Sequence, residues 1–284
     1  MSPSPPPPPP TAAQINADVQ RALDEDSGPG DLTAQLIAQP ARAQASIIAR
    51  EPGVLAGAPW AEACFKHIDP TCNVSRLRND GDRLTKDAVI LTVTGPARAL
   101  LTAERPALNF LQTLSATATA TARYVAAVQG TGARVLDTRK TLPGLRRAQK
   151  YAVLCGGGCN HRMGLFDAVL IKENHIAAAG SVGHAVRQAY ANAHGAWVEI
   201  EVQSLDELTQ ALDAGAQRIL LDNFQLDDLR AAVALNAGRA RLEASGGINL
   251  NTLRAIAETG VHDISVGAIT KDIKALDLSM RFTP

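Results

Sequence analysis

The chain contains 284 residues, which is enough for one large domain or two modest ones. Its 28 basic residues balance its 28 acidic residues, and this neutrality argues against a nucleic-acid-binding protein with a broad basic face. Every apolar run is shorter than the roughly 18 residues that cross a membrane, and the N-terminus lacks the pattern of a secretion signal. We therefore expect a soluble, cytoplasmic protein with no membrane or nucleic-acid partner.

The first region predicts a small antiparallel α+β unit behind a proline-rich start. The run Pro5–Pro10 is typical of a polyproline II tail without a packing role. Helical spacing at residues 15–23 is followed by a short helix at 58–65 and by strand-like segments at 43–50, 73–77 and 88–93. This unit extends to about residue 105.

A long helical stretch from Ala99 to Val128 leads from the first region to the second. Pro106 lacks the N–H that an internal helical position requires, so we expect a helix to restart near this residue. Arg105 would then place a cation on a helix between the two regions.

The second region repeats short strands and helices. Six β-branched-rich runs occur at residues 134–137, 168–172, 197–202, 218–222, 241–244 and 263–266, and helical patterns such as 205–214, 226–235 and 250–259 lie between them. This alternation predicts parallel strands joined by right-handed crossovers. We interpret it as a nearly closed (β/α) barrel, with one more unit near residues 151–154. A doubly wound open sheet is the alternative.

The strands of this second region end in polar or glycine residues. Because the carboxyl ends of parallel barrel strands share one edge, we expect a single binding site there. Glu199 and Glu201 alternate along the third strand, so both side chains should point to its inner face. The other strand ends are residues 137–140, 172–175, 222–223, 245–247 and 267–268.

Positive charge concentrates between residues 137 and 175, where seven basic residues stand against three acidic ones. A local excess of this kind in a neutral chain favours a small polyanionic ligand. Arg146, Arg147 and Lys150 are better explained as the solvated face of a helix.

Gly246, Gly247 and Gly267 favour a phosphate site. Their backbone N–H groups can approach an anion without interference from a Cβ atom, and a helix that begins near residues 249–251 would add the positive end of its dipole. Barrels commonly bind phosphate after their last two strands. Tight turns without a ligand are the alternative explanation of these glycines.

Glu201 and Asp222, on neighbouring strands, are suited to Mg²⁺ or to sugar hydroxyls. Lys172 could form a Schiff base, as in aldolase chemistry, or bind a phosphate or carboxylate. We favour binding because many other cations surround it.

Arg139, His161 and Arg162 indicate a ligand with two carboxylates, since each guanidinium can bind a carboxylate through two parallel hydrogen bonds. A zinc site that combines His161 and His175 with two cysteines is the alternative, but the spacing fits no common zinc pattern. We expect the four cysteines, Cys64, Cys72, Cys155 and Cys159, to be reduced thiols.

Several long motifs are more specific than any single glycine pattern. They are Asp137-Thr-Arg-Lys-Thr-Leu-Pro-Gly144, Lys150-Tyr-Ala-Val-Leu-Cys-Gly-Gly-Gly158, Asn160-His-Arg162, Leu170-Ile-Lys-Glu-Asn-His175 and Leu221-Asp-Asn-Phe224, with Glu104-Arg105 and residues 107–112 and 275–282. Together they resemble the quinolinate phosphoribosyltransferase family, and the resemblance covers nearly everything after the proline tail.

The resemblance implies a disordered tail at residues 1–12, an N-terminal α/β sandwich domain at 13–115 plus 273–284, and a barrel-like (β/α) catalytic domain at 116–272, incomplete relative to a full TIM barrel. It implies transfer of phosphoribosyl from phosphoribosyl pyrophosphate to quinolinate with decarboxylation. The products would be nicotinate mononucleotide, pyrophosphate and CO₂, for NAD biosynthesis, and the cofactor would be Mg²⁺. A homodimer with shared active sites, or a higher oligomer, is also implied.

By position, the resemblance assigns the predicted residues to parts of the two substrates. Those that would hold the two quinolinate carboxylates are Arg105, Arg139, His161 and Arg162. Lys140 and Lys172 would bind phosphate and pyrophosphate, and Glu201 and Asp222 would bind the ribose and Mg²⁺. These four residues form the catalytic set. The remaining substrate-binding residues are Thr138 and the phosphate-binding Ser245, Gly246, Gly247, Val266, Gly267 and Ala268.

Two positions depart from the expected pattern: Pro106 replaces a small polar residue, and Asp272 stands where relatives often carry histidine. Three other functions compete with the main interpretation. They are a related phosphoribosyltransferase-like protein of the molybdenum-transport type, a Schiff-base aldolase that uses Lys172, and a phosphate-sugar binding protein without catalysis. The arginine–histidine group argues against the first, because a ligand without two carboxylates would not need it.

Overall fold

The computed structural model describes residues 10–283, so most of the expected proline-rich tail, residues 1–9, lies outside the described residues. The Thr11 hydroxyl accepts the backbone N–H of Gln14 and caps helix α1 (Ala12–Ser27). The chain forms two compact units: residues up to 122, 142–157 and 270 onward make up the first, and residues 123–141 and 158–269 the second. In the described part of the chain, no helix is long and apolar enough to cross a membrane.

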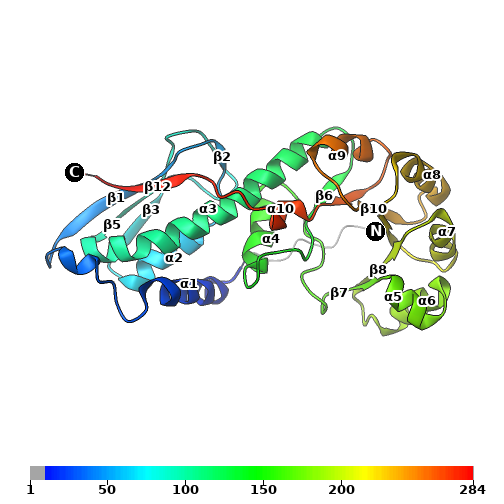
Figure 1. Ribbon diagram of the computed structural model, residues 1–284, viewed down its shortest axis with the longest axis horizontal. Coiled ribbons are helices and arrows are strands. Elements are labelled where there is room, and N and C mark those ends of the chain that lie inside the picture. Colours follow the sequence, from blue (N-terminus) through cyan, green and yellow to red (C-terminus); the bar gives the residue numbers. More distant parts are fainter. Residues whose placement is uncertain (1–9, 284) are drawn as a thin grey trace. The chain divides into compact units, whose positions relative to one another are not determined.

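The first unit is built on a four-stranded antiparallel sheet with the order β12-β1-β5-β3 (Figure 1). The three predicted strands are confirmed as β1 (Arg42–Ala49), β3 (Asn73–Arg76) and β5 (Val89–Pro96). The strand β12 (Leu278–Thr283) brings the end of the chain beside β1. The other elements are a short pair, β2 (Gly53–Val54) and β4 (Arg83–Leu84), the 3₁₀ helix η1 (Ala34–Leu36), and helices α2 (Ala58–Ile68), α3 (Ala97–Ala127) and α4 (Arg146–Cys155).

Helix α3 continues through Pro106, so the predicted restart is wrong. Proline removes only the N–H that would bind the carbonyl of Thr102, and Pro106 itself is buried. Burial of the surrounding apolar face outweighs this one lost hydrogen bond. The buried side chains on both sides of the proline are Leu100, Ala103, Ala107, Leu108 and Leu111.

Residues 151–154 lie in helix α4, so they are not the strand of another barrel unit. The expected solvated face of this helix holds for Arg147, which is exposed, but is wrong for Lys150, which is completely buried. The neighbouring Gln149 is also buried, and its side chain donates to the carbonyl of Thr270 at 2.9 Å. Tertiary contacts within the first unit therefore bury a helix face that looks polar in sequence.

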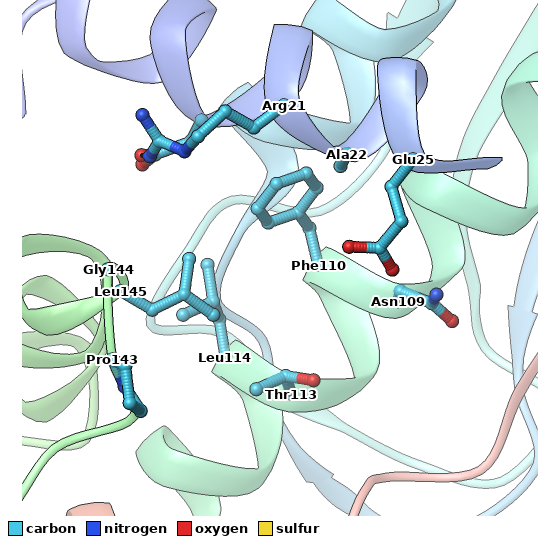
Figure 2. A pocket seen from close by; sticks show the side chains of 11 residues that line it. Arg21, Ala22, Glu25, Asn109, Phe110, Thr113, Leu114, Pro143, Gly144 and Leu145 are labelled. Atoms are coloured by element: carbon cyan, nitrogen blue, oxygen red, sulfur yellow. Dashed lines mark hydrogen bonds and ion pairs between the residues drawn. The ribbon is translucent and has the colours of Figure 1, made fainter. Parts of the chain in front are cut away.

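A cavity of about 330 Å³ opens in the first unit between α1, α3 and the loop before α4 (Figure 2). Phe110 and Leu114 supply apolar lining from α3, while Arg21 and Glu25 supply charged lining from α1. None of its lining residues belongs to the predicted substrate site.

The second unit contains a six-stranded parallel sheet with the order β6-β11-β10-β9-β8-β7. All six predicted strands are confirmed, as β6 (Arg134–Leu136), β7 (Ala168–Ile171), β8 (Trp197–Val202), β9 (Arg218–Asp222), β10 (Arg241–Ser245) and β11 (Asp263–Ser265). Between and after them come α5 (Glu173–Ala179), α6 (Val182–Asn192), α7 (Leu205–Asp213), α8 (Leu226–Asn236), α9 (Leu250–Ala257) and α10 (Ala268–Lys271). Helices α6 to α9 lie in an arc outside the strands, each beside the next (Figure 1).

This sheet is an incomplete barrel, as expected. Its strands follow chain order from β7 to β11, and β11 then pairs with the first strand, β6, as it would in a closed barrel. Among the described residues β6 and β7 are not paired, and no closed barrel forms. A doubly wound sheet reverses its strand order at a switch point, and this sheet does not.

A single residue fills part of the open side. Cys159 forms an isolated parallel bridge with Leu136 of β6, through its N–H to the carbonyl of Val135 at 2.9 Å and its carbonyl to the N–H of Asp137 at 3.1 Å. The chain after α4 therefore runs beside β6 where a further barrel strand would lie.

Charged side chains fill the interior near the amino ends of the strands. The buried carboxylate of Asp263 on β11 accepts hydrogen bonds from Arg134 at 2.8 and 3.2 Å and from Arg241 at 2.8 Å, and Arg218 lies 3.8 Å away. Burial acts to raise the pKa of Asp263, but the hydrogen bonds from Arg241 and Arg134 outweigh it and hold the pKa below its usual value. This carboxylate links β11 to β6, β9 and β10.

Two more buried carboxyl groups, Glu199 on β8 and Glu243 on β10, lie inside the same sheet. The Nε atom of Arg218 is 3.6 Å from Glu199. Burial and the negative charge of Glu199 raise the pKa of Glu243 to about 8, so Glu243 is mainly protonated at neutral pH.

We predict that Asp263→Ala lowers the free energy of unfolding by about 3–5 kcal/mol, because the guanidiniums around it lose a buried counter-ion. Urea unfolding followed by circular dichroism measures the change. Asp213→Ala is the matched control, since Asp213 is exposed and faces Arg239 at 3.5 Å on the surface. Equal losses in the two variants would contradict a structural role for the buried carboxylate.

We predict that Glu243→Gln changes the pH dependence of stability. Above the usual glutamate pKa of 4.5, the folded protein keeps a proton that the unfolded chain releases. The contribution of Glu243 to stability is therefore complete below pH 4.5 and is lost as the pH rises toward 8, by up to about 1.4 kcal/mol per pH unit. Urea unfolding at several pH values should show a smaller decline for the glutamine variant than for the unchanged protein, and parallel declines would refute the prediction.

Candidate active site

The loops after the first and last strands of the barrel meet at its carboxyl edge. A Cβ atom added to Gly267 would lie 2.9 Å from Cδ of Lys140 and 3.6 Å from Oγ1 of Thr138. Oγ1 of Thr138 in turn accepts the backbone N–H of Lys140 at 3.0 Å. The N–H of Val266 donates to the carbonyl of Leu136 at 2.9 Å and so holds the two loops together. A side chain at position 267 would displace Lys140.

Lys172 and Glu201 form the next part of this edge. Lys172 is the N-cap residue of α5, and its Nζ atom lies 2.5 Å from Oε2 of Glu201 on β8. The register of β7 and β8 sets Ile171 opposite Ile200, which makes the next residue on each strand neighbours as well. Nδ1 of His175 accepts the Lys172 N–H at 3.0 Å, so this histidine caps the helix.

Arg139 and Arg162 lie near one another in the same interior. Arg162 is largely buried, and its Nη1 atom donates to the carbonyl of Ala168 at 3.4 Å. Burial and then the positive charge of Arg139 lower the pKa of Arg162, while the carboxylates of Asp167, Glu199 and Glu201 act in the opposite direction. Because two guanidiniums brought together in a partly buried space repel each other, a dianion between them would be stabilised.

Asp222, Asn223 and the glycines after β10 form a third group. Asn223 has a left-handed backbone (φ 59°), donates its side-chain amide to Asp222 at 2.9 Å and donates its N–H to the carbonyl of Ser245 at 2.9 Å. A Cβ atom on Gly246 would lie 2.1 Å from the Asn223 side-chain oxygen, so only glycine fits. No atom lies within 4 Å of the corresponding position on Gly247, which leaves the backbone accessible to a ligand.

His161 lies deeper, inside the barrel. Its Nε2 atom is 2.8 Å from Glu199, its Nδ1 atom accepts the backbone N–H of Arg162 at 2.8 Å, and its own N–H donates to Asp137 at 2.9 Å. The sequence did not predict these partners. Charged residues at alternating positions of the buried strands, such as Glu199 on β8 and Glu243 on β10, were the available signal.

Three predicted features belong to the other unit or already have a partner. Arg105 is exposed on α3 in the first unit. Asp272 is also in the first unit, 3.7 Å from Lys271. At the start of α9 the Asn249 side chain accepts the N–H of Asn251 at 2.9 Å, so the helix uses for its own cap a donor that we expected to face phosphate. All the other predicted site residues belong to the second unit and lie at or after its strand ends, except His161 and Arg162, which lie between β6 and β7.

The residues at this edge fit a magnesium ion. Mg²⁺ prefers oxygen ligands and often takes one or two carboxylates together with substrate phosphates. Glu201 and Asp222 each have one carboxylate oxygen in a hydrogen bond, to Lys172 and Asn223, which leaves a second oxygen on each. The nearby cations would oppose a bare metal ion, so an anionic substrate would have to arrive with it.

Comparison with known proteins identifies the family. The quinolinate phosphoribosyl transferase N-terminal domain matches residues 31–115, and the C-terminal domain of the same family matches residues 117–281. A probable nicotinate-nucleotide pyrophosphorylase (carboxylating) from Bacillus subtilis is 43% identical over 260 residues, which is 91% of this chain and 90% of the relative. The structure of the nicotinate-nucleotide pyrophosphorylase from Francisella tularensis is 46% identical, with a TM-score of 0.94, and the match covers 96% of this chain and 97% of that one. The chain therefore belongs to the quinolinate phosphoribosyltransferase family.

Proposed function

We propose that this chain transfers phosphoribosyl from phosphoribosyl pyrophosphate to quinolinate with decarboxylation, and so forms nicotinate mononucleotide, pyrophosphate and CO₂ for NAD biosynthesis. Relatives at 42–43% identity are named quinolinate phosphoribosyltransferase (decarboxylating) or nicotinate-nucleotide pyrophosphorylase (carboxylating). The observation that carries the proposal is that arginines, lysines, carboxylates and a glycine turn meet at the carboxyl edge of one parallel sheet. These groups match a dicarboxylate ring, a pyrophosphate and a sugar phosphate.

Quinolinate would bind between Arg139 and Arg162, which lie close enough that the positive charge of Arg139 lowers the pKa of Arg162. Each can bind one carboxylate through two hydrogen bonds. We assign a further contact to Arg105 of the partner subunit, since this arginine is exposed on α3 and belongs to a different unit from the rest of the site. The expected contact between His161 and a carboxylate stays a prediction.

Phosphoribosyl pyrophosphate would occupy the remainder of the edge. Gly247 leaves its backbone accessible for the 5′-phosphate, with Gly246, Ser245 and the 266–268 loop beside it. Lys140 and Lys172 would face the pyrophosphate, with Thr138 holding the loop of Lys140. Glu201 and Asp222 would bind the ribose hydroxyls and Mg²⁺, which supplies positive charge to the pyrophosphate when bound.

The chemistry requires placement and charge more than proton transfer. The ring nitrogen of quinolinate forms a bond to C1 of ribose as the bond from C1 to pyrophosphate breaks, and Lys140 and Lys172 stabilise the departing anion. The ring then carries a positive charge, accepts the electron pair released when the 2-carboxylate leaves as CO₂, and gains a proton at that carbon. Holding both substrates in one geometry contributes on the order of 7–11 kcal/mol.

The aldolase alternative is disfavoured by the contact of Lys172 with Glu201 at 2.5 Å, because a paired ammonium is not a nucleophile. Borohydride trapping of a substrate adduct on Lys172 would reverse this judgement. The molybdenum-transport alternative does not explain two neighbouring arginines, and a non-catalytic binding protein would bind phosphoribosyl pyrophosphate without releasing pyrophosphate.

We further propose a cytoplasmic homodimer or higher oligomer, with the domain division at about residue 115. Light scattering of the purified protein measures its oligomeric state.

The direct test is an assay of the purified protein with quinolinate, phosphoribosyl pyrophosphate and Mg²⁺. We expect equal amounts of CO₂, pyrophosphate and nicotinate mononucleotide, and no product when the metal is chelated. Release of pyrophosphate without CO₂, or no product at all, would overturn the proposal.

Arg139→Ala and Arg162→Ala should each weaken quinolinate binding by about 10- to 100-fold, because each removes charge-assisted hydrogen bonds to a carboxylate. Calorimetry with each substrate separately should show a much smaller effect on phosphoribosyl pyrophosphate. Arg187→Ala, at an exposed position of α6, is the control and should change neither. Equal losses for both substrates would contradict the dicarboxylate assignment.

The shared active site predicts complementation between two inactive variants. A mixture of Arg105→Ala and Lys140→Ala subunits should regain activity, up to about a quarter of the unchanged protein's if subunits mix at random, because half of the sites in hybrid dimers carry neither substitution. Native mass spectrometry verifies the heterodimers. Inactive verified heterodimers would show that both residues act within one subunit.

A further inference from the structure

The segment 159–164 crosses the open side of the barrel without regular secondary structure, yet its backbone is fixed. Four successive N–H groups donate to side-chain acceptors: that of His161 to Asp137 at 2.9 Å, that of Arg162 to the His161 ring at 2.8 Å, and those of Met163 and Gly164 to Asp167 at 2.7 and 2.8 Å. Side chains thus replace the ladder that a strand would provide. The two residues proposed or expected to bind carboxylates, His161 and Arg162, lie in the middle of this fixed segment.

The hydrogen bonds of His161 define the protonation of its ring. Nδ1 accepts the Arg162 N–H, so this nitrogen carries a lone pair and no proton. The proton of a neutral ring is then on Nε2, which lies 2.8 Å from the buried carboxylate of Glu199. The ring also packs edge-on against Trp197, with centroids 5.2 Å apart. Both ring nitrogens are therefore already engaged with the protein.

The same neighbourhood suggests a metal site as the competing interpretation, because ligand atoms of His161, Glu199 and Glu243 lie within 4.8 Å of one another. The ring nitrogens of His161, however, already form hydrogen bonds. The interior also holds Arg218, 3.6 Å from Glu199 and 3.8 Å from Asp263, and a divalent cation would be repelled by this guanidinium. The arrangement is that of a hydrogen-bonded support.

We infer that His161 is a positioning residue and not a substrate ligand: its neutral ring, held by Glu199, fixes the backbone and hence the guanidinium of Arg162 for a carboxylate. Arg162 has one further anchor on its guanidinium, the Ala168 carbonyl at 3.4 Å. This inference rests on the proposed function, since it assigns His161 a role in quinolinate binding through Arg162. It assigns Glu199 the supporting role.

The first test is ¹⁵N NMR of histidine-labelled protein at neutral pH, with His161→Asn to assign the ring among the six histidines. We expect one protonated and one unprotonated ring nitrogen, with no change of protonation when quinolinate is added. A ring that is protonated on both nitrogens, before or after quinolinate, would overturn the inference.

The second test is a double-mutant cycle on quinolinate binding, measured by calorimetry. His161→Ala should raise the Kd by about tenfold in the unchanged protein, since one backbone donor loses its acceptor. It should have no further effect in the Arg162→Ala background, because the residue acts through Arg162. A direct ligand would cost the same affinity in both backgrounds, and that result would refute the positioning role.

Conservative variants separate positioning from general damage to the fold. His161→Asn keeps an oxygen that can accept the Arg162 N–H, so it should retain affinity better than His161→Ala. His184→Asn, at an exposed position of α6, is the matched control and should leave the Kd unchanged. If His161→Asn binds no better than His161→Ala, the Nδ1 contact does not position Arg162.

The tests also distinguish failure of this inference from failure of the proposed function. If the unchanged protein neither binds quinolinate nor forms product, the function is wrong and the positioning role falls with it. The NMR spectrum of the protein alone would still decide the ring tautomer. If the protein is active and the ring is doubly protonated, only the inference about His161 fails.

Discussion

The shape of the second unit depends on a buried carboxylate, that of Asp263. A parallel barrel that stops before closure lacks one ladder of hydrogen bonds, so something else must keep its strands curved around a common interior. Asp263 is bound by Arg134 of β6 and Arg241 of β10 and faces Arg218 of β9. Hydrogen-bonded guanidinium–carboxylate pairs have a defined geometry, so this cluster fixes direction as well as distance. The ion pairs thus tie β11 to β6, β10 and β9 on one side of the incomplete barrel.

The substrate edge is built on the same strands as this interior cluster. Side chains two residues apart on a strand point to the same face, so Glu201 follows Glu199 on β8 and Asp222 follows Arg218 by four residues on β9. The residues that hold the barrel in shape therefore lie beneath those proposed to bind substrate. A change in the interior would tilt the strand ends and alter binding without touching a ligand.

The sequence predicted all six strands of the second unit, and β1, β3 and β5 of the first, because most of them are short β-branched runs between turn residues. It did not predict β2, β4 or β12. It also predicted that the strand ends would share an edge, since parallel strands leave no other arrangement. It failed where tertiary packing overrides local preference. Helix α3 passes through Pro106 because both flanking turns are buried, and Lys150 is buried although it follows Arg146 and Arg147 on the same short helix. Both outcomes depend on contacts with residues distant in the chain.

The sequence did not predict the hydrogen-bond partners of His161 for a related reason. A histidine next to an arginine in a cationic segment looks like a further cation for an anionic ligand. What decides its state is Glu199, which is 38 residues away in the chain, together with a backbone N–H that no side-chain pattern reveals. In the interior, Asp263 and Glu199 face arginine side chains, whereas the edge carries four cations, Arg139, Lys140, Arg162 and Lys172, against Glu201 and Asp222. A neutral His161 fits this division, since the excess positive charge then belongs to side chains at the edge, where a pyrophosphate and two carboxylates would complete the balance.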